Sequence, residues 1–387
     1  MKRIYLDNAA TTWPKPEPVY AAMERYQRDV GASAGRGAYR DAHTAHREVD
    51  GARLLCAQLL GMSDPSQVIF GCNATDMLNL AIAGVLRPGD RVVTTVVEHN
   101  SILRPIAALA QRLTLDVVHV RCDSLGFVDL DELRRACTEK PPRLVAINHG
   151  SNVTGAVQPV REMADIAHDA GAVVVLDAAQ SLGHIPVNLA QLGVDLLGAS
   201  GHKGLLGPAG TGLLAIRPGM EQQLQPVKVG GTGGDSDAVI APELLPSRYE
   251  AGSHNVPALA GVSAAVRYLA ERDVASIAQH EAALTTQLIE GLSEIAGVTV
   301  YGPPPGPQRL GVVSFAVAGY DPQEFATALD AARGVQARAG LHCAPLLHRA
   351  LGTHAGGGLS RLSIGWANTA EEIAAAIAAV AELASAA

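Results

Sequence analysis

The sequence predicts an α/β fold: a mainly parallel, seven-stranded sheet between helices, followed by a smaller α+β domain. Two observations carry this prediction. Short runs rich in valine, leucine and isoleucine alternate along the chain with helical patterns, which is the order expected for right-handed βαβ crossovers. Several of these runs are apolar throughout, which is typical of strands that are covered on both faces.

The predicted strands of the sheet are short and end at glycine, proline or polar residues. They are Gln67–Phe70, Arg91–Val96, Leu115–Val120, Arg143–Asn148, Val173–Asp177, Leu196–Ser200 and Gly212–Ile216. The helices predicted between them include Thr75–Val85, Ser101–Gln111, Leu130–Cys137 and Val160–Ala170. Each helix therefore connects one strand of the sheet to the next.

The pattern changes after Asn255-Val256-Pro257, so we place a domain boundary near residue 256. A chain of 387 residues exceeds the usual size of one hydrophobic core. We expect a large domain over residues 15–256 and a small domain over 257–387, with residues 1–14 packing on the small domain. The small domain is predicted from a helical stretch over 257–295 broken near 271–275, strands at 298–301 and 311–317, a helix over 322–333, a loop rich in glycine and histidine, a strand at 361–365 and a terminal helix.

Composition excludes several classes of protein. The net charge is −8 and no run of basic residues occurs, which argues against nucleic acid as a partner. No segment is apolar and long enough to be a signal core or a membrane span, so we expect a cytoplasmic protein with no membrane partner. The five cysteines form no CxxC pair, a pattern that fits neither a disulfide framework nor a metal site.

Two strand ends carry residues of opposite charge. Asp177 ends one buried strand, and Lys203 follows the next in Ser200-Gly-His-Lys-Gly204, where glycines let the backbone approach a bulky group. Ligands of open α/β sheets bind beyond the carboxyl ends of the strands. Pyridoxal phosphate (PLP) requires such a pair, because a lysine amine forms its Schiff base and a carboxylate keeps its ring nitrogen protonated. The sequence therefore indicates PLP on Lys203.

Two further strand ends fit the same cofactor. The segment Phe70–Asp76 leads from a strand through glycine into a helix, whose free N–H groups and Thr75 hydroxyl suit a phosphate. His99 follows another strand and could stack on a flat ring and exchange protons. Read alone, each of these residues is equally compatible with ordinary capping or with a hydrogen bond to the backbone.

Taken together, these segments resemble the class V aminotransferase family of fold type I PLP enzymes, and within it the cysteine desulfurases and selenocysteine lyases. The similarity covers nearly the whole chain, and its markers occur in the order of the family. They are Tyr5–Thr12, Thr75, Glu98–Ser101, His149–Gly155, Asp177–Gln180, Ser200–Gly204, Gly207–Gly210, Arg248–Asn255 and Arg361–Thr369.

The resemblance implies roles at the matching positions. Lys203 would be the Schiff-base lysine, Asp177 would pair with the ring nitrogen, Gln180 with the ring hydroxyl, and His99 would stack on the ring. The phosphate would be held by Thr75, Ser200 and His202, and by Ser253 from the other subunit of a homodimer, near the loop Gly230–Gly234 that contains Thr232. The substrate carboxylate would be bound by Asn152 and Arg361.

Cys343 is the residue that distinguishes among the reactions this family could carry out. The segment Arg338–Pro345 resembles the catalytic loop of desulfurases, in which a cysteine takes sulfur from L-cysteine as a persulfide and leaves L-alanine. We expect Cys343 to be exposed, with Arg338 and His342 lowering its pKa, and Cys56, Cys72, Cys122 and Cys137 to be buried. A selenocysteine lyase, C–S lyase, epimerase or aminotransferase that does not use Cys343 stays open, as does a noncatalytic protein of the same fold. A sulfur-acceptor protein is a further expected partner.

Overall fold

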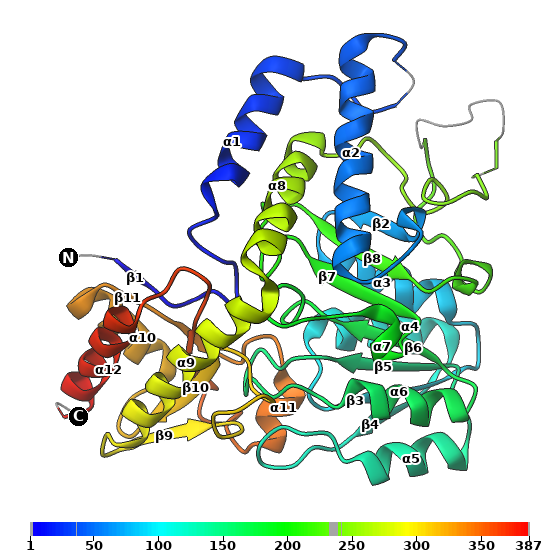
Figure 1. Cartoon of the computed structure of the whole chain (residues 1–387). Helices are drawn as coiled ribbons and strands as arrows, with labels where there is room; N and C mark the ends of the chain where they lie inside the picture. Colours follow the sequence, from blue (N-terminus) through cyan, green and yellow to red (C-terminus); the bar gives the residue numbers. More distant parts are fainter. Residues whose placement is uncertain (1–2, 36, 232–238, 241, 386–387) are drawn as a thin grey trace.

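A seven-stranded sheet forms the centre of the molecule in the computed structural model, which describes residues 3–35, 37–231, 239–240 and 242–385 (Figure 1). The strand order across the sheet is β2-β8-β7-β6-β5-β3-β4. The pairs from β7 to β4 are parallel, and β8 runs antiparallel to both of its neighbours. The strands are β2 (Val68–Gly71), β3 (Arg91–Thr95), β4 (Asp116–Val120), β5 (Leu144–Asn148), β6 (Val173–Asp177), β7 (Leu196–Ser200) and β8 (Gly212–Ile216). The predicted fold class is thereby confirmed.

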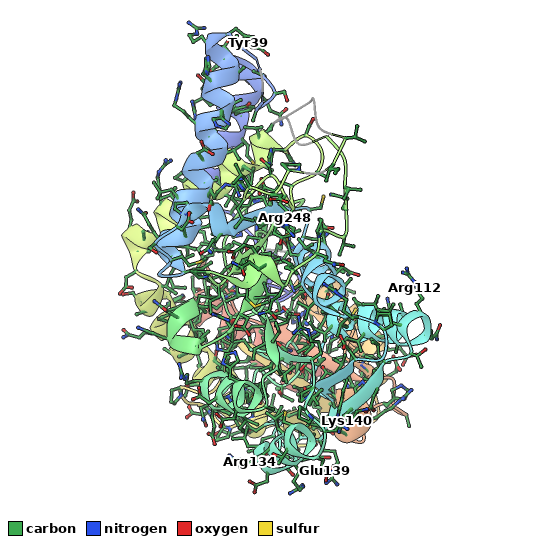
Figure 2. The ribbon with its side chains drawn as sticks, turned by 90° about the vertical axis from the view of Figure 1, so that its right-hand side faces the viewer. Tyr39, Arg112, Arg134, Glu139, Lys140 and Arg248 are labelled. Carbon is green, nitrogen blue, oxygen red and sulfur yellow. The ribbon has the colours of Figure 1, made fainter. Side chains whose placement is uncertain are left out.

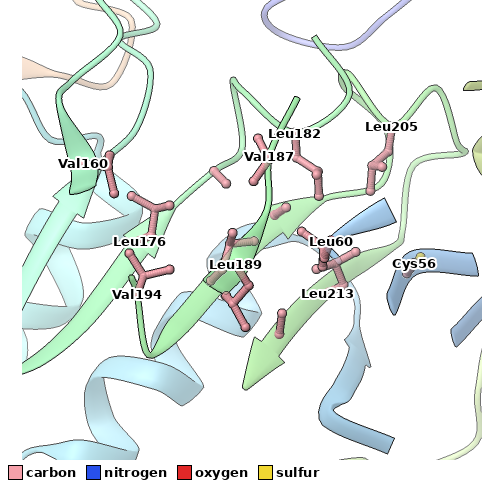
Figure 3. Packing of buried hydrophobic residues seen from close by; sticks show 14 of the residues in the cluster. Cys56, Leu60, Val160, Leu176, Leu182, Val187, Leu189, Val194, Leu205 and Leu213 are labelled. Atoms are coloured by element: carbon pink, nitrogen blue, oxygen red, sulfur yellow. The ribbon is translucent and has the colours of Figure 1, made fainter. Parts of the chain in front are cut away.

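The apolar strands are buried on both faces, because helices cover each face of the sheet. Val174 and Leu176 of β6 belong to a cluster with residues of α2 (Arg40–Leu59), α6 (Val160–Asp169) and α8 (Val256–Arg272). Val173 and Val175 point to the opposite cluster, with α3 (Ala74–Val85) and α4 (Asn100–Leu113). Figure 3 shows part of the first cluster, in which Leu176 and Leu213 of the sheet lie among Leu60, Leu189 and their neighbours. This two-sided packing fixes the ends of the strands, from which the polar residues project.

Shorter elements complete the region before residue 256. They are α1 (Glu17–Arg25), η1 (Tyr26–Val30), η2 (Pro65–Gln67), α5 (Leu130–Glu139), α7 (Leu189–Leu192) and η3 (Met220–Gln222). Helices α1 and α2 pack against α8, and together they form the upper part of the molecule in Figure 1. Within the described residues, none of the helices has both the length and the apolar character that crossing a membrane requires.

The second region contains a four-stranded antiparallel sheet in the order β12-β13-β10-β9. The predicted break in the helical stretch lies at Asp273, whose side chain caps the second helix by accepting the Ala275 N–H. Residues 338–350, predicted as loop, form a short strand and a helix instead, because residues 338–340 pair with β13 and Pro345 favours a helix start. The elements are α9 (Val274–Ser293), β9 (Val298–Tyr301), β10 (Val312–Val317), α10 (Pro322–Arg333), β11 (Val335–Gln336), β12 (Arg338–Gly340), α11 (Pro345–Ala350), β13 (Leu359–Ser363) and α12 (Ala370–Ala384).

The N-terminal segment pairs with this second region. Strand β1 (Ile4–Tyr5) lies parallel to β11, and Asp7 forms a bridge with Ser363 at the end of β13. The buried side chains of α8 belong to the core of the large sheet. The division of the chain into domains at residue 256 stays a prediction.

Candidate active site

A cavity opens at the carboxyl ends of β6 and β7, where the sequence predicts the cofactor. It is lined by Asn73, Ala74, Thr75, His99, Ser101, Asn148, Asn152, Asp177, Ala179, Gln180, Ser200, His202 and Lys203. The structure thus brings Thr75, His99, Asn152, Asp177, Gln180, Ser200, His202 and Lys203 to one place, although these residues come from five separate segments of the chain. The described residues contain no cluster of histidine, cysteine, aspartate or glutamate that could hold a metal ion.

Asp177 and Lys203 form the charged centre of the cavity. Asp177 ends β6 and is 4% exposed, and its Oδ1 accepts the Ala179 N–H at 2.9 Å. Burial raises the pKa of Asp177, while this N–H and the nearby Lys203 charge oppose the rise. Burial likewise lowers the pKa of Lys203 to about 8, and Asp177 limits the decrease. Lys203 therefore has a much larger neutral fraction near pH 7 than an ordinary lysine, and nucleophilic attack by its amine requires the neutral form.

The pKa of Lys203 gives a testable pH dependence. In cofactor-free protein, about a tenth of Lys203 is neutral at pH 7, roughly two hundredfold more than for an unperturbed lysine. Labelling of the Lys203 peptide by an amine-specific reagent should rise from pH 6 and level off above pH 9, with its midpoint near 8. Mass spectrometry of digests would follow the labelling, with N-acetyl-lysine as the reference. A midpoint above pH 10 would contradict the buried environment.

His99 lies between β3 and α4 and caps that helix. Its Nδ1 accepts the Ser101 N–H at 3.0 Å and lies 2.8 Å from Ser101 Oγ, which in turn lies 2.8 Å from Thr75 Oγ1. Burial is the main cause that lowers the pKa of His99 to about 4, and the positive charge of Lys203 adds to it. The imidazole is therefore neutral near pH 7, and its acceptor role at Nδ1 leaves the proton on Nε2. Ser101, which connects His99 to Thr75, had no role in the prediction.

Three buried polar atoms on residues of the cavity lining have no hydrogen-bond partner within the described part of the chain. They are Ser200 Oγ, His202 Nδ1 and Asn152 Oδ1. An unsatisfied buried polar group costs on the order of 1–3 kcal/mol, so such atoms indicate that a ligand completes the site. Helix α3 also begins at this cavity, with Asn73 as its cap. A helix start and two unsatisfied side chains fit a phosphate, and Asp177 with Lys203 fit a pyridine ring and its aldehyde.

Arg361 lies on β13 with its side chain 2% exposed, and it is already paired. Its Nη2 donates to Asp7 Oδ1 at 2.7 Å, and its Nη1 donates to the Asn152 carbonyl at 3.0 Å. Arg361 does not line the cavity itself, but Asn152 does, and the hydrogen bond between these two residues connects Arg361 to the cavity. The sequence prediction missed Asp7. The only available signal was its place in the Tyr5–Thr12 motif, because its partner lies 354 residues away.

Cys343 is exposed, as predicted, on a loop that is fixed to the cavity wall. Its carbonyl accepts the Asn100 N–H at 2.7 Å, and Asn152 Nδ2 donates to the His342 carbonyl at 2.6 Å. Both His342 and Cys343 have positive φ angles, 46° and 59°, which side chains other than glycine rarely adopt. The backbone thus presents Cys343 in an unusual conformation held by two hydrogen bonds.

Two expectations about this loop and the other cysteines need correction. Burial holds the pKa of His342 well below its ordinary value, so His342 is uncharged near pH 7 and supplies no positive charge to the thiol. Cys72 is exposed and Cys122 is half-buried, because Cys72 lies in the turn before α3 and Cys122 follows β4. Cys56 and Cys137 are buried as expected, and burial raises the pKa of Cys56 to about 12.

Ser253 lies apart from the cavity of its own chain. It lines a different hollow, together with Gly71, Cys72 and His254. Gly230 and Gly231 are exposed, and Thr232 lies outside the described residues. Ser253 is therefore not among the residues that line the cavity of its own chain.

A lysine and an acid at adjacent strand ends of this fold define a class of enzyme, and the similarity of the chain to known proteins identifies that class. Residues 4–375 match the family described as Aminotransferase class-V, and the chain belongs to this family. A protein of Methanothermobacter thermautotrophicus named "Probable cysteine desulfurase" is 37% identical over 375 residues, which cover 96% of this chain and 92% of the relative.

Solved structures agree with this relationship. The apo structure of a cysteine desulfurase from Thermococcus onnurineus NA1 matches with a TM-score of 0.93 and 34% identity, over 100% of this chain and 95% of the other. The cysteine desulfurase CsdA from Escherichia coli matches with a TM-score of 0.89 and 29% identity, over 99% and 95%. Within its family, the chain is therefore similar to cysteine desulfurases along its whole length.

Proposed function

We propose that this chain is a PLP-dependent cysteine desulfurase that converts L-cysteine to L-alanine and takes the sulfur onto Cys343 as a persulfide. The observation that carries the proposal is an exposed Cys343 on a loop fixed to the wall of the cavity that contains Lys203 and Asp177. The similarity to cysteine desulfurases supports the same conclusion. An enzyme that only exchanged amino groups would have no need of this thiol.

The residues of the cavity fit PLP. Lys203 Nζ would hold it covalently, Asp177 would face its ring nitrogen, and His99 would lie against its ring. Gln180, whose Nε2 donates to the Ala9 carbonyl at 2.9 Å, would contact the ring hydroxyl. Thr75, Ser200 Oγ and His202 Nδ1 would bind the phosphate. The phosphate would then provide hydrogen-bond partners for two of the three unsatisfied polar atoms of the cavity lining, Ser200 Oγ and His202 Nδ1. When bound, PLP supplies an electron sink that stabilises negative charge at Cα of an amino acid.

The chain's own residues would act on the substrate in sequence. Arg361 and Asn152 would bind the carboxylate of L-cysteine and orient it toward Lys203. Lys203 Nζ would take the Cα proton, and the Cys343 thiolate would attack the substrate sulfur. The C–S bond breaks as the S–S bond forms, and Cβ gains a proton. L-cysteine and one thiol therefore yield L-alanine and one persulfide, without an added oxidant.

The direct test is to incubate purified, PLP-loaded protein with L-cysteine and a thiol reductant and to measure sulfide and alanine together. Equal amounts of both products are expected, because each persulfide that the reductant cleaves corresponds to one alanine. L-Selenocysteine and L-alanine would serve as alternative substrates. Pyruvate and ammonia with sulfide would instead indicate an elimination, and racemised alanine without sulfide an epimerase.

The protein is further proposed to be a cytoplasmic homodimer that passes sulfur to an acceptor protein. The position of Ser253 outside the cavity of its own chain supports a role for it in the phosphate site of a partner subunit. A Lys203→Ala chain and a Ser253→Asp chain, each inactive alone, should recover about half of the wild-type activity as a doubly tagged heterodimer, since one of its two sites is intact.

The matched control for this complementation is a heterodimer of Lys203→Ala with a chain that carries both Lys203→Ala and Ser253→Asp. This control has no intact lysine and should stay inactive. Size-exclusion chromatography would establish the assembly state of each sample. Full activity in a monomeric fraction would refute the shared site.

A further inference from the structure

The N-terminal segment 11–15 contacts the backbone that carries Lys203. The carbonyl of His202 accepts hydrogen bonds from Thr12 N at 3.1 Å, from Thr11 Oγ1 at 3.1 Å and from Lys15 Nζ at 2.7 Å. A carbonyl oxygen has two lone pairs, so this group is more than saturated with donors. The segment thus holds the peptide that precedes Lys203 from one side.

Lys15 acts on the next peptide as well. Its Nζ donates to Thr12 Oγ1 at 2.6 Å, and Thr12 Oγ1 donates to the Lys203 carbonyl at 3.0 Å. The same Lys203 carbonyl accepts the Leu206 N–H at 2.8 Å, which closes the turn after the lysine. Lys15 therefore stands at the start of a chain of hydrogen bonds that ends on the backbone of Lys203.

Lys15 is an unusual residue for this position. No carboxylate pairs with it within the described part of the chain, and burial lowers its pKa to about 7. Burying an amine without a counter-charge is unfavourable unless its hydrogen bonds compensate. Both bonds survive a change of protonation, because a neutral amine still has two N–H groups. An apolar side chain would fill the same space without the free-energy cost of burying an amine. The two hydrogen bonds of Lys15 are therefore what distinguishes it from an apolar residue at this position.

The same N-terminal segment also contacts other parts of the site. The Ala9 carbonyl accepts from Gln180, and Asp7 pairs with Arg361. The segment is itself anchored, because Asn8 Nδ2 donates to the Ser363 carbonyl at 2.9 Å and Trp366 Nε1 donates to the Pro14 carbonyl at 3.1 Å. Hydrogen bonds of Lys15 therefore connect an anchored segment to the backbone at His202 and, through Thr12, at Lys203.

We propose that Lys15 is a positioning residue, which fixes the His202–Lys203 backbone through its hydrogen bonds to Thr12 Oγ1 and the His202 carbonyl. Lys15 does not line the cavity, and its effect passes through the backbone to Lys203 Nζ. The inference rests on the proposed role of Lys203 in proton transfer. In this inference, the N-terminal segment helps to hold Lys203 Nζ close enough to the substrate Cα for proton transfer.

Kinetics provide the first test. Lys15→Met keeps the length of the side chain and removes both hydrogen bonds of Lys15 Nζ. The kcat for L-cysteine should therefore decrease about tenfold to a hundredfold. The KM should stay within about twofold, because Arg361 and Asn152 are untouched. Lys15→Arg retains donors and should recover most of the loss. The control Lys140→Met changes an exposed lysine that follows α5, in the lower part of Figure 2, and that pairs with Asp116 at 2.8 Å. This variant should behave as wild type.

Hydrogen exchange on cofactor-free protein provides a second test that does not depend on turnover. The Gly201, Leu206 and Gly207 amides all form backbone hydrogen bonds around this turn. In Lys15→Met, the peptide spanning them should exchange about tenfold faster, while peptides from α5 keep the wild-type rate. If Lys15→Met does not fold, Thr12→Val removes the middle link of the same chain and should show both effects.

The two tests separate this inference from the proposed function. If wild-type protein releases no alanine from L-cysteine, the desulfurase proposal fails, while the exchange experiment still decides whether Lys15 holds the turn. Unchanged exchange over residues 201–207 would overturn the inference. Turnover of Lys15→Met within twofold of wild type would also overturn it.

Discussion

Lys203→Ala should lower the turnover of L-cysteine by at least about a thousandfold, which is the loss expected when the group that moves the substrate proton is removed. The substitution shortens the whole aminobutyl side chain to a methyl group, so nothing remains at this position to hold the cofactor covalently or to take the Cα proton. Within the described residues, the Lys203 side chain makes no hydrogen bond that supports the fold, and its pKa of about 8 already reflects an unfavourable burial. The variant should therefore fold normally.

The measurements are steady-state turnover, circular dichroism and reductive trapping. Borohydride should fix the cofactor on the Lys203 peptide of the wild type and on no peptide of the variant. Lys140→Ala, on the exposed α5 end, is the matched control and should keep wild-type turnover and labelling. Cofactor trapped on a peptide other than that of Lys203 would disprove the assignment at the centre of the proposed mechanism.

The centre of the site could be predicted because it depends on local patterns. Asp177 follows four apolar residues, and Lys203 follows a similar run, so both must leave the sheet at its carboxyl edge. The register confirms the neighbourhood, since Asp177 lies opposite Gly198 across the β6–β7 pair. The closeness of the acid and the lysine could thus be predicted from two strand ends of a parallel sheet, without knowing the rest of the fold.

The surroundings of the site could not be predicted in the same way, because they depend on contacts between distant segments. Asp7 meets Arg361 only because the N-terminus pairs with β11 and β13, and Lys15 reaches His202 across 187 residues. Strand β12 is only three residues long and forms by pairing with β13, so its own sequence carries no clear strand pattern. The exposure of Cys72 likewise follows from the geometry of the turn before α3 rather than from its apolar character.

The second large effect concerns Cys343. In Cys343→Ser, substrate binding should be retained, because Arg361, Asn152 and Lys203 are unchanged and the carbonyl of residue 343 can still accept the Asn100 N–H. Release of alanine and sulfide from L-cysteine should nevertheless decrease by about a thousandfold or more, because a neutral alcohol is a far poorer nucleophile toward sulfur than a thiolate. Cys122→Ser, which changes a half-buried thiol after β4, is the matched control and should retain activity.

Mass spectrometry distinguishes this mechanism from the other reactions of the family. Wild-type protein quenched during turnover should carry one additional sulfur atom on the Cys343 peptide, and treatment with a reductant should remove it. Arg361→Ala should instead mainly raise the KM for L-cysteine, because the proposed contact of the guanidinium with the carboxylate would be equally strong before and during the reaction. If Cys343→Ser releases alanine at the wild-type rate and the native peptide gains no sulfur, the thiol is not the acceptor. The same cavity would then have to act by elimination or transamination, in which Lys203 and Asp177 suffice.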